Sequence, residues 1–131
     1  MYKAVEEAVR INAKSFAMFL CNQKTWNNKP LEEKDAEKFR STCQKHNFAS
    51  HLMIPHGSYL MNCGSPDKET LTKSRNLLVD GLKRCEMLDI YGYNFHPGST
   101  CGKISVKDCL DKIAESINHA HSLTNNTVAG K

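Results

Sequence analysis

Two histidines occupy matching places in this chain, each after a short apolar run and before a turn of small residues. His56 lies within PHGSYL at 55–60, and His96 lies within NFHPGS at 94–99. Imidazole at such a place is a common metal ligand or general base. Either histidine alone is more simply read as a hydrogen-bonded residue at a strand end. Their pairing instead favours one shared site.

The segments that would position these histidines alternate between strand-like and helical patterns. Residues past the carboxyl ends of parallel strands converge on one face of a barrel or doubly wound sheet, so such strands would bring the histidines together. The order predicts repeated βα architecture. A buried strand is expected over 15–20, and further strands over 51–55 and 90–95. Helices are expected over 2–12, 32–46, 67–88 and after the capping box of Ser105 and Asp108, with 123–131 unstructured.

The apolar stripes of the helices predict which side chains face a core. The expected inward residues include Val5, Ala8 and Val9; Ala36, Phe39 and Cys43; Leu71, Leu78, Leu82 and Cys85; and Val106, Leu110, Ile113, Ile117 and Ala120. Three strands are few for a parallel sheet that is covered on both faces. We therefore expect part of a larger barrel.

Length, composition and net charge limit the classes of protein to which this chain could belong. The 131 residues suit a single domain over 1–131, and no apolar run approaches the ~20 residues of a membrane span. Acidic residues near the amino terminus do not match a secretory signal, which favours an intracellular protein without a membrane partner. None of the six cysteines forms a Cys-x-x-Cys pair, so reduced packing thiols are expected. The net charge of +4 permits a nucleic-acid partner without establishing one.

Several strings, taken in order, resemble the endonuclease IV type of apurinic/apyrimidinic (AP) endonuclease. The resemblance covers nearly the whole chain. Its strings are 15–19 with Asn22, Gln23, Lys24 and Trp26, then 55–62, 84–86, 94–100 and 113–118. Each string is moderately specific alone, and their order and spacing make the match strong.

This resemblance implies an α/β fold, a partial TIM-like (β/α)8 barrel with about three parallel strands and covering helices. In the family, loops at the carboxyl ends of the strands hold a cluster of three zinc ions. The implied reaction is cleavage of double-stranded DNA on the 5′ side of an abasic site, in base excision repair. By resemblance, His56 and His96 are two ligands of one zinc.

The family pattern extends beyond this chain at both ends. Its first strand would precede Met1, and the bridging glutamate and later zinc ligands would follow Lys131. We therefore expect a partial barrel that lacks the first strand and the C-terminal half, and that is weakly active or inactive alone. Exposed strand edges would favour self-association or completion by another chain.

The resemblance also assigns DNA contacts. Tyr59 and Leu60 suit a wedge inserted at the lost base, and the alternative is that both pack beneath their loop. Lys24 stands where the family usually has arginine, so a point charge replaces a planar fork. The full expected set is Asn22, Gln23, Lys24, Tyr59, Leu60 and Ser99.

Two other function classes remain open. Related barrels include sugar isomerases and epimerases with divalent metals at the same face, but the loop at 22–24 and the pair Tyr59 and Leu60 favour DNA. A non-catalytic fragment that binds DNA or associates with itself is the other class. An AP endonuclease would work in the nucleus and mitochondrion of a eukaryote, or in the cytoplasm of a bacterium.

Overall fold

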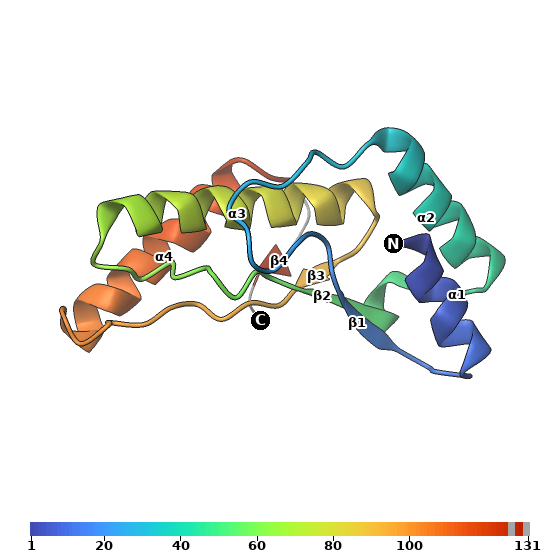
Figure 1. Cartoon of the computed structure of the whole chain (residues 1–131), viewed down its shortest axis with the longest axis horizontal. Coiled ribbons are helices and arrows are strands. Elements are labelled where there is room, and N and C mark those ends of the chain that lie inside the picture. The colour runs from blue at the N-terminus through green and yellow to red at the C-terminus, as the bar shows by residue number, and fades with distance from the viewer. Residues whose placement is uncertain (126–127, 130–131) are drawn as a thin grey trace.

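Helices and strands alternate along the chain (Figure 1). The computed structural model describes residues 1–125 and 128–129. The elements are α1 (Tyr2–Arg10), β1 (Phe16–Phe19), α2 (Glu33–Lys45), the 3-10 turn η1 (Ser50–Leu52), β2 (Met53–His56), α3 (Lys68–Met87), β3 (Gly92–Tyr93), α4 (Val106–Ser122) and β4 (Val128–Ala129). The predicted βα order is confirmed.

The strands lie parallel and side by side in chain order. β1 pairs with β2 in a register that sets Phe19 opposite His56, and β3 pairs with β4. A parallel bridge between His56 and Asn94 joins the two pairs. Backbone hydrogen bonds from Gly57 N to Asn94 O (2.8 Å) and from Asn94 N to Pro55 O (2.9 Å) secure this junction. Parallel neighbours linked through helices are the repeating unit of a TIM barrel.

The sheet has one covered and one open face, because successive side chains of a strand point to opposite sides. Met53, Pro55 and Tyr93 are buried, whereas Ile54 and Asn94 are exposed. In Figure 1, α1 and α2 lie together at one end of the molecule and α3 and α4 at the other, with the strands between them. The covered face of the sheet therefore contributes to the core.

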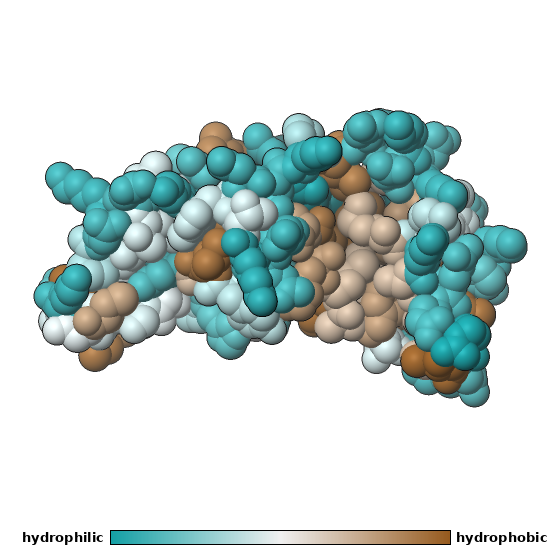
Figure 2. Space-filling model, in the orientation of Figure 1, coloured by the Kyte–Doolittle hydropathy of each residue, from teal (hydrophilic) through white to brown (hydrophobic). Residues whose placement is uncertain are grey.

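The expected burial of 15–20 is largely wrong. Within that run only Leu20 is buried; Phe16 is half-buried and Ala17 is exposed. In the part of the chain that is described, β1 pairs only with β2 and forms an edge. Figure 2 shows hydrophobic colour gathered where Figure 1 places β1. An apolar run identifies a strand, and its burial depends on what lies beside it.

The predicted burial of the apolar helix residues is confirmed where the helix packs against another element. All three predicted residues of α2 are buried, as are Leu78, Leu82 and Cys85 of α3. Leu71 is only half-buried, and Val9 is 39% exposed because α1 packs on α2 through the stripe that contains Val5 and Ala8. On α4, Ala120 is buried and Ile113 and Ile117 pack against the core, but the prediction for Val106 and Leu110 is wrong. These two are 67% and 58% exposed, because on the first turns of α4 the buried side is the one that carries Cys109.

Side-chain caps begin the two helices that follow the histidine loops. Asp67 accepts a hydrogen bond from Thr70 N at 2.7 Å, and this bond lowers the pKa of the Asp67 carboxyl. The predicted helix cap at Ser105 is confirmed, because Ser105 Oγ accepts from Asp108 N (3.0 Å). The return bond of a capping box differs here, since Asp108 Oδ2 accepts from the Ser105 hydroxyl (2.7 Å). The chain therefore turns into α3 and α4 at defined positions.

The expectation of no structure over 123–131 is wrong at β4. Val128 and Ala129 pair with Gly92 and Tyr93, and a two-residue strand is too short to leave a period in the sequence. The rest of that expectation falls partly on 126–127 and 130–131, which lie outside the described residues. Of the helices described, none combines the length and apolar character needed to cross a bilayer.

Candidate functional site

The two histidines meet at the carboxyl ends of β2 and β3. His56 is the last residue of β2, and His96 follows the end of β3 by three residues. Their ring centroids lie 5.1 Å apart with an interplanar angle of 58°. The structure thus brings together two side chains that are forty positions apart in sequence.

The His56 ring is held by its own loop. Its Nδ1 lies 2.7 Å from the carbonyl oxygen of Gly57, which can only accept a hydrogen bond. In the neutral ring Nδ1 therefore carries the proton, and Nε2 keeps its lone pair for a ligand. A backbone carbonyl that orients an imidazole in this way is a common partner of metal-binding histidines.

Two aromatic rings complete the cluster. The Tyr59 ring lies 5.4 Å from His56 and 6.1 Å from His96, and the Phe19 ring lies 5.4 Å from His56 and 5.5 Å from Tyr59. Tyr59 remains 60% exposed, so it stands beside the histidines and open to solvent. Sequence reasoning missed Phe19, which only the β1–β2 register places opposite His56.

A buried serine joins the loop after β1 to the loop after β2. Ser58 Oγ donates to the carbonyl oxygen of Gln23 at 2.8 Å and accepts from Leu60 N at 3.3 Å. Ser58 is only 6% exposed, and Leu60 is half-buried. The predicted DNA-contact residues of the two loops are thereby held next to each other.

The loop after β1 has its own internal bonds. Asn22 Oδ1 accepts from Lys24 N at 2.9 Å, so this oxygen already has a partner, while the Lys24 side chain is exposed. Gln23 is half-buried. Trp26 packs against the core, which anchors the loop and leaves Lys24 at its tip.

Ser99 lies in the loop after β3 and is exposed. Its hydroxyl accepts from Cys101 N at 3.2 Å, and its backbone N–H and C=O both bond to the side chain of Asn62. Sequence reasoning gave Asn62 no role. The sequence signal for such a role is an amide side chain six residues after His56, in a loop whose backbone groups need hydrogen-bond partners.

The donor set at this site suits zinc but supplies only part of a coordination shell. Imidazole nitrogen is a typical zinc ligand, and a catalytic zinc takes about three protein ligands with one position left open. Among the described residues, no group of three or more His, Cys, Asp or Glu side chains lies close enough to share a metal ion. His56 and His96 are therefore the pair that could hold it.

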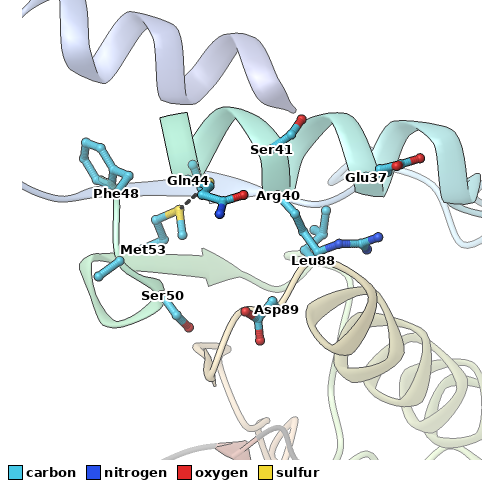
Figure 3. Close-up of a pocket in the computed structure, with 11 residues that line it drawn as sticks. Glu37, Arg40, Ser41, Gln44, Phe48, Ser50, Met53, Leu88 and Asp89 are labelled. Carbon is cyan, nitrogen blue, oxygen red and sulfur yellow. Dashed lines mark hydrogen bonds between the residues drawn. The ribbon is translucent and has the colours of Figure 1, made fainter. Parts of the chain in front are cut away.

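A cavity in the described part of the chain lies away from the histidines. It has a volume of about 590 Å³ and opens between α2, the start of β2 and the end of α3 (Figure 3). Arg40 lies on its wall, donates to the carbonyl oxygen of Met87 and pairs with Glu33 at 2.7 Å. Met53 lines this cavity at the beginning of the strand that His56 ends, so cavity and histidines lie at opposite ends of β2.

Known proteins resemble this chain in sequence. An apurinic-apyrimidinic endonuclease 1 from Plasmodium berghei is 46% identical over 118 residues, which cover 90% of this chain and 23% of that protein. A probable endonuclease 4 from Phocaeicola vulgatus is 47% identical over 111 residues, covering 85% of this chain and 40% of that protein. The chain therefore spans less than half the length of these curated relatives.

A solved structure and a family model agree with the sequence matches. The crystal structure of endonuclease IV from Thermus thermophilus superposes with a TM-score of 0.81 at 26% identity, covering 98% of this chain and 45% of that one. The family model described as a xylose isomerase-like TIM barrel matches residues 5–127. The predicted partial TIM-like barrel is confirmed, and the chain belongs to the xylose isomerase-like TIM barrel family, among relatives of the endonuclease IV type.

Proposed function

We propose that this chain carries part of the active site of a zinc-dependent AP endonuclease, which cleaves the DNA backbone on the 5′ side of an abasic site in base excision repair. The observation that carries the proposal is the pair of His56 and His96, 5.1 Å apart at the carboxyl ends of two neighbouring strands. Relatives that bear the endonuclease name support it. Because the chain spans 45% or less of those relatives and of endonuclease IV, the activity is proposed for the protein that contains this segment.

His56 and His96 would hold one zinc ion through their free ring nitrogens. Zinc, when bound, supplies a hydroxide at neutral pH and stabilises charge on phosphoryl oxygens. The contribution of this chain is orientation, because the Gly57 carbonyl fixes the His56 ring and the strands fix the spacing of the two loops. The remaining ligands of a three-zinc cluster would come from outside the described residues.

The surface around the histidines suits damaged duplex DNA. Tyr59 is exposed next to both histidines, and aromatic or apolar side chains commonly enter the stack where a base is missing. Leu60 follows it on the same loop, and Lys24 offers an exposed positive charge for phosphate. Polar contacts to the DNA would come from Asn22, Gln23 and Ser99. The Oδ1 atom of Asn22 already accepts a hydrogen bond from Lys24 N, so Asn22 would contact DNA through its amide nitrogen.

The open face of the sheet favours a second, non-catalytic role for the isolated chain. Ile54 is 50% exposed on this face, and β1 presents an edge in the described part of the chain. Uncovered apolar surface and unpaired strand edges promote association. We therefore also propose that this chain alone binds a second copy, or another chain that completes the barrel.

A cleavage assay separates these roles. A duplex oligonucleotide with one abasic site would be incubated with the protein that contains this segment and with this chain alone, with and without a chelator, beside an undamaged duplex of the same sequence. Nicking 5′ to the lesion that the chelator abolishes supports the endonuclease proposal. Binding to the damaged duplex without nicking supports the non-catalytic role, and isomerisation of a sugar with no DNA cleavage would overturn the DNA assignment. Native mass spectrometry of the same sample reports dimers and bound zinc.

A further inference from the structure

The side chain of Asn62 uses its full hydrogen-bonding capacity between the two histidine loops. Its Oδ1 accepts from Ser99 N at 3.0 Å and from Gly64 N at 3.1 Å. Its Nδ2 donates to Ser99 O at 2.9 Å and to Cys101 Sγ at 3.4 Å. An amide has two acceptor sites and two donor protons, so this set also fixes which atom is oxygen and which is nitrogen.

The paired bonds to Ser99 imitate a strand neighbour. Two residues of adjacent strands bond through N–H and C=O groups of their backbones, and here one side-chain amide bonds to both backbone groups of a single residue. This holds the backbone three residues beyond His96 in position and orientation. A bond from Cys63 N to Pro97 O at 2.9 Å supports the same junction.

These bonds from the Asn62 side chain to the loop after β3 are called the clamp below, and the clamp is tied to α3. Asn62 N donates to Ser74 Oγ at 2.9 Å, and this hydroxyl, on a residue fully buried within α3, donates to Thr70 O at 2.7 Å. The partner loop approaches so closely that a Cβ on Gly98, whose φ is +151°, would lie 2.4 Å from Asn62 Oδ1. Only glycine fits there without moving the clamp.

We propose that Asn62 is a positioning residue that sets the separation of His56 and His96 by clamping the loop after β3 to the loop after β2. The loop after β2 is fixed to α3 through Ser74. The exposed His96 is held on one side by the backbone bonds of Asn94 to Pro55 and Gly57, and on the other side by the bonds of Asn62 to Ser99. Loss of the clamp frees this second side, so the His96 ring can move away from His56 while the strand junction at Asn94 remains. The consequence for zinc rests on the proposed function, but the ring separation does not.

The test uses the whole chain and three variants. Asn62→Ala removes the hydrogen bonds of both Oδ1 and Nδ2. Asn62→Asp keeps the shape and both acceptor bonds, but it sets a second oxygen against Ser99 O and makes that contact repulsive. Gly98→Ala presses on the clamp from the other side. The matched controls are Asn118→Ala, an exposed asparagine of α4, and Gly102→Ala, a loop glycine with positive φ and no atom within 4 Å of the added Cβ.

Two measurements report on each variant. The first is the proton NOE between the rings of His56 and His96 in histidine-labelled protein without metal, with amide shifts of α1 and α2 as a check on folding. The second is zinc affinity by calorimetry. We expect the inter-ring NOE in the unmodified chain and in both controls, and its loss in all three clamp variants. Zinc Kd should rise about tenfold in those variants, as for other residues that orient metal ligands.

The outcomes separate this inference from the proposed function. If Asn62→Asp keeps its α1 and α2 shifts and also keeps the inter-ring NOE, the positioning role is wrong. If the controls lose the NOE as the clamp variants do, the effect is general loosening and the role is again wrong. If the unmodified chain shows the NOE but binds no zinc, the zinc proposal fails for this chain while the positioning of the rings stands.

Discussion

The two faces of the sheet are built on the same strands and behave differently. On β2, Met53 and Pro55 lie against the helices and are buried, while Ile54 is half exposed and His56 joins the ring cluster. The covered face is a packed core. The open face carries the groups that could bind metal and DNA, so neighbouring residues of one strand divide between stability and chemistry.

The two ends of β2 differ as well. The end that begins the strand carries a cavity of about 590 Å³, and the end that finishes it carries the histidines. Carboxyl-end loops hold the active sites of TIM barrels, whereas the amino-terminal end serves stability. The proposed site therefore rests on the chemistry of the side chains at the carboxyl end of β2, and not on the size of a cavity.

The largest effect should come from truncation on the covered face. We expect Met53→Ala to lower the free energy of unfolding by about 2 to 5 kcal/mol, because it leaves a cavity in the core. Ile54→Ala, on the adjacent residue but the open face, should cost less than about 1 kcal/mol. Equilibrium urea denaturation measures both. Equal losses would show that the open face is covered in solution.

Arg84 should come next, because it joins α3 to the loop after β1. It is 5% exposed, bonds to Asp80 at 2.7 Å and donates to Lys29 O at 2.6 Å. Arg84→Ala should lower the free energy of unfolding by about 1.5 to 3 kcal/mol, the range for charged hydrogen bonds. Arg10→Ala removes an exposed pair with Glu7 and should leave the urea midpoint unchanged.

Histidine variants test whether zinc binds at the carboxyl end of β2 or at its beginning. His56→Ala or His96→Ala should weaken zinc binding in calorimetry by at least the roughly 10- to 100-fold that loss of a residue orienting a metal ligand costs, since each removes one of the two proposed ligands. His51→Ala is the matched control, because His51 is exposed just before β2 begins. An equal loss of affinity in the His51 variant would place the zinc away from the carboxyl ends.

The buried thiols should give the smallest effect. Burial raises the pKa of Cys63 to about 11 and of Cys85 to about 12, from a usual value of 9.0. The unfolded thiol ionises first as pH rises, so the unfolded state binds fewer protons and stability falls above pH 9. At pH 10 the loss is on the order of 1 kcal/mol per thiol.

The alkaline effect has an internal control. In Cys85→Ala, the fall of the urea midpoint between pH 8.5 and pH 10.5 should be shallower than in the unmodified chain. Exposed Cys101 should react with a thiol reagent in the folded protein at pH 8, while Cys63 and Cys85 should not. Rapid reaction of either buried thiol in the folded chain would contradict the covered face described above.

Local patterns predicted the elements well and their surroundings less well. Three of the predicted features are confirmed because they depend on nearby residues: the helix cap at Ser105, the buried stripe of α2 and the strands that lead to the two histidines. The burial of 15–20, of Val9 and of the first turns of α4 is wrong because it depends on which element lies opposite. The short strand β4 takes its form from pairing with β3.

The sequence by itself determined that helices and strands alternate and that each histidine ends an apolar run, because periodicity, caps and turn residues act over a few positions. The sequence also identified the family, because the order of its motifs matches that of AP endonucleases. Only the tertiary structure decided that the two rings lie 5.1 Å apart, that Tyr59 lies beside both and Phe19 beside His56, and that Asn62 bonds to the loop after His96. Those relations depend on strand register and loop path, which are set by contacts between residues far apart in the chain.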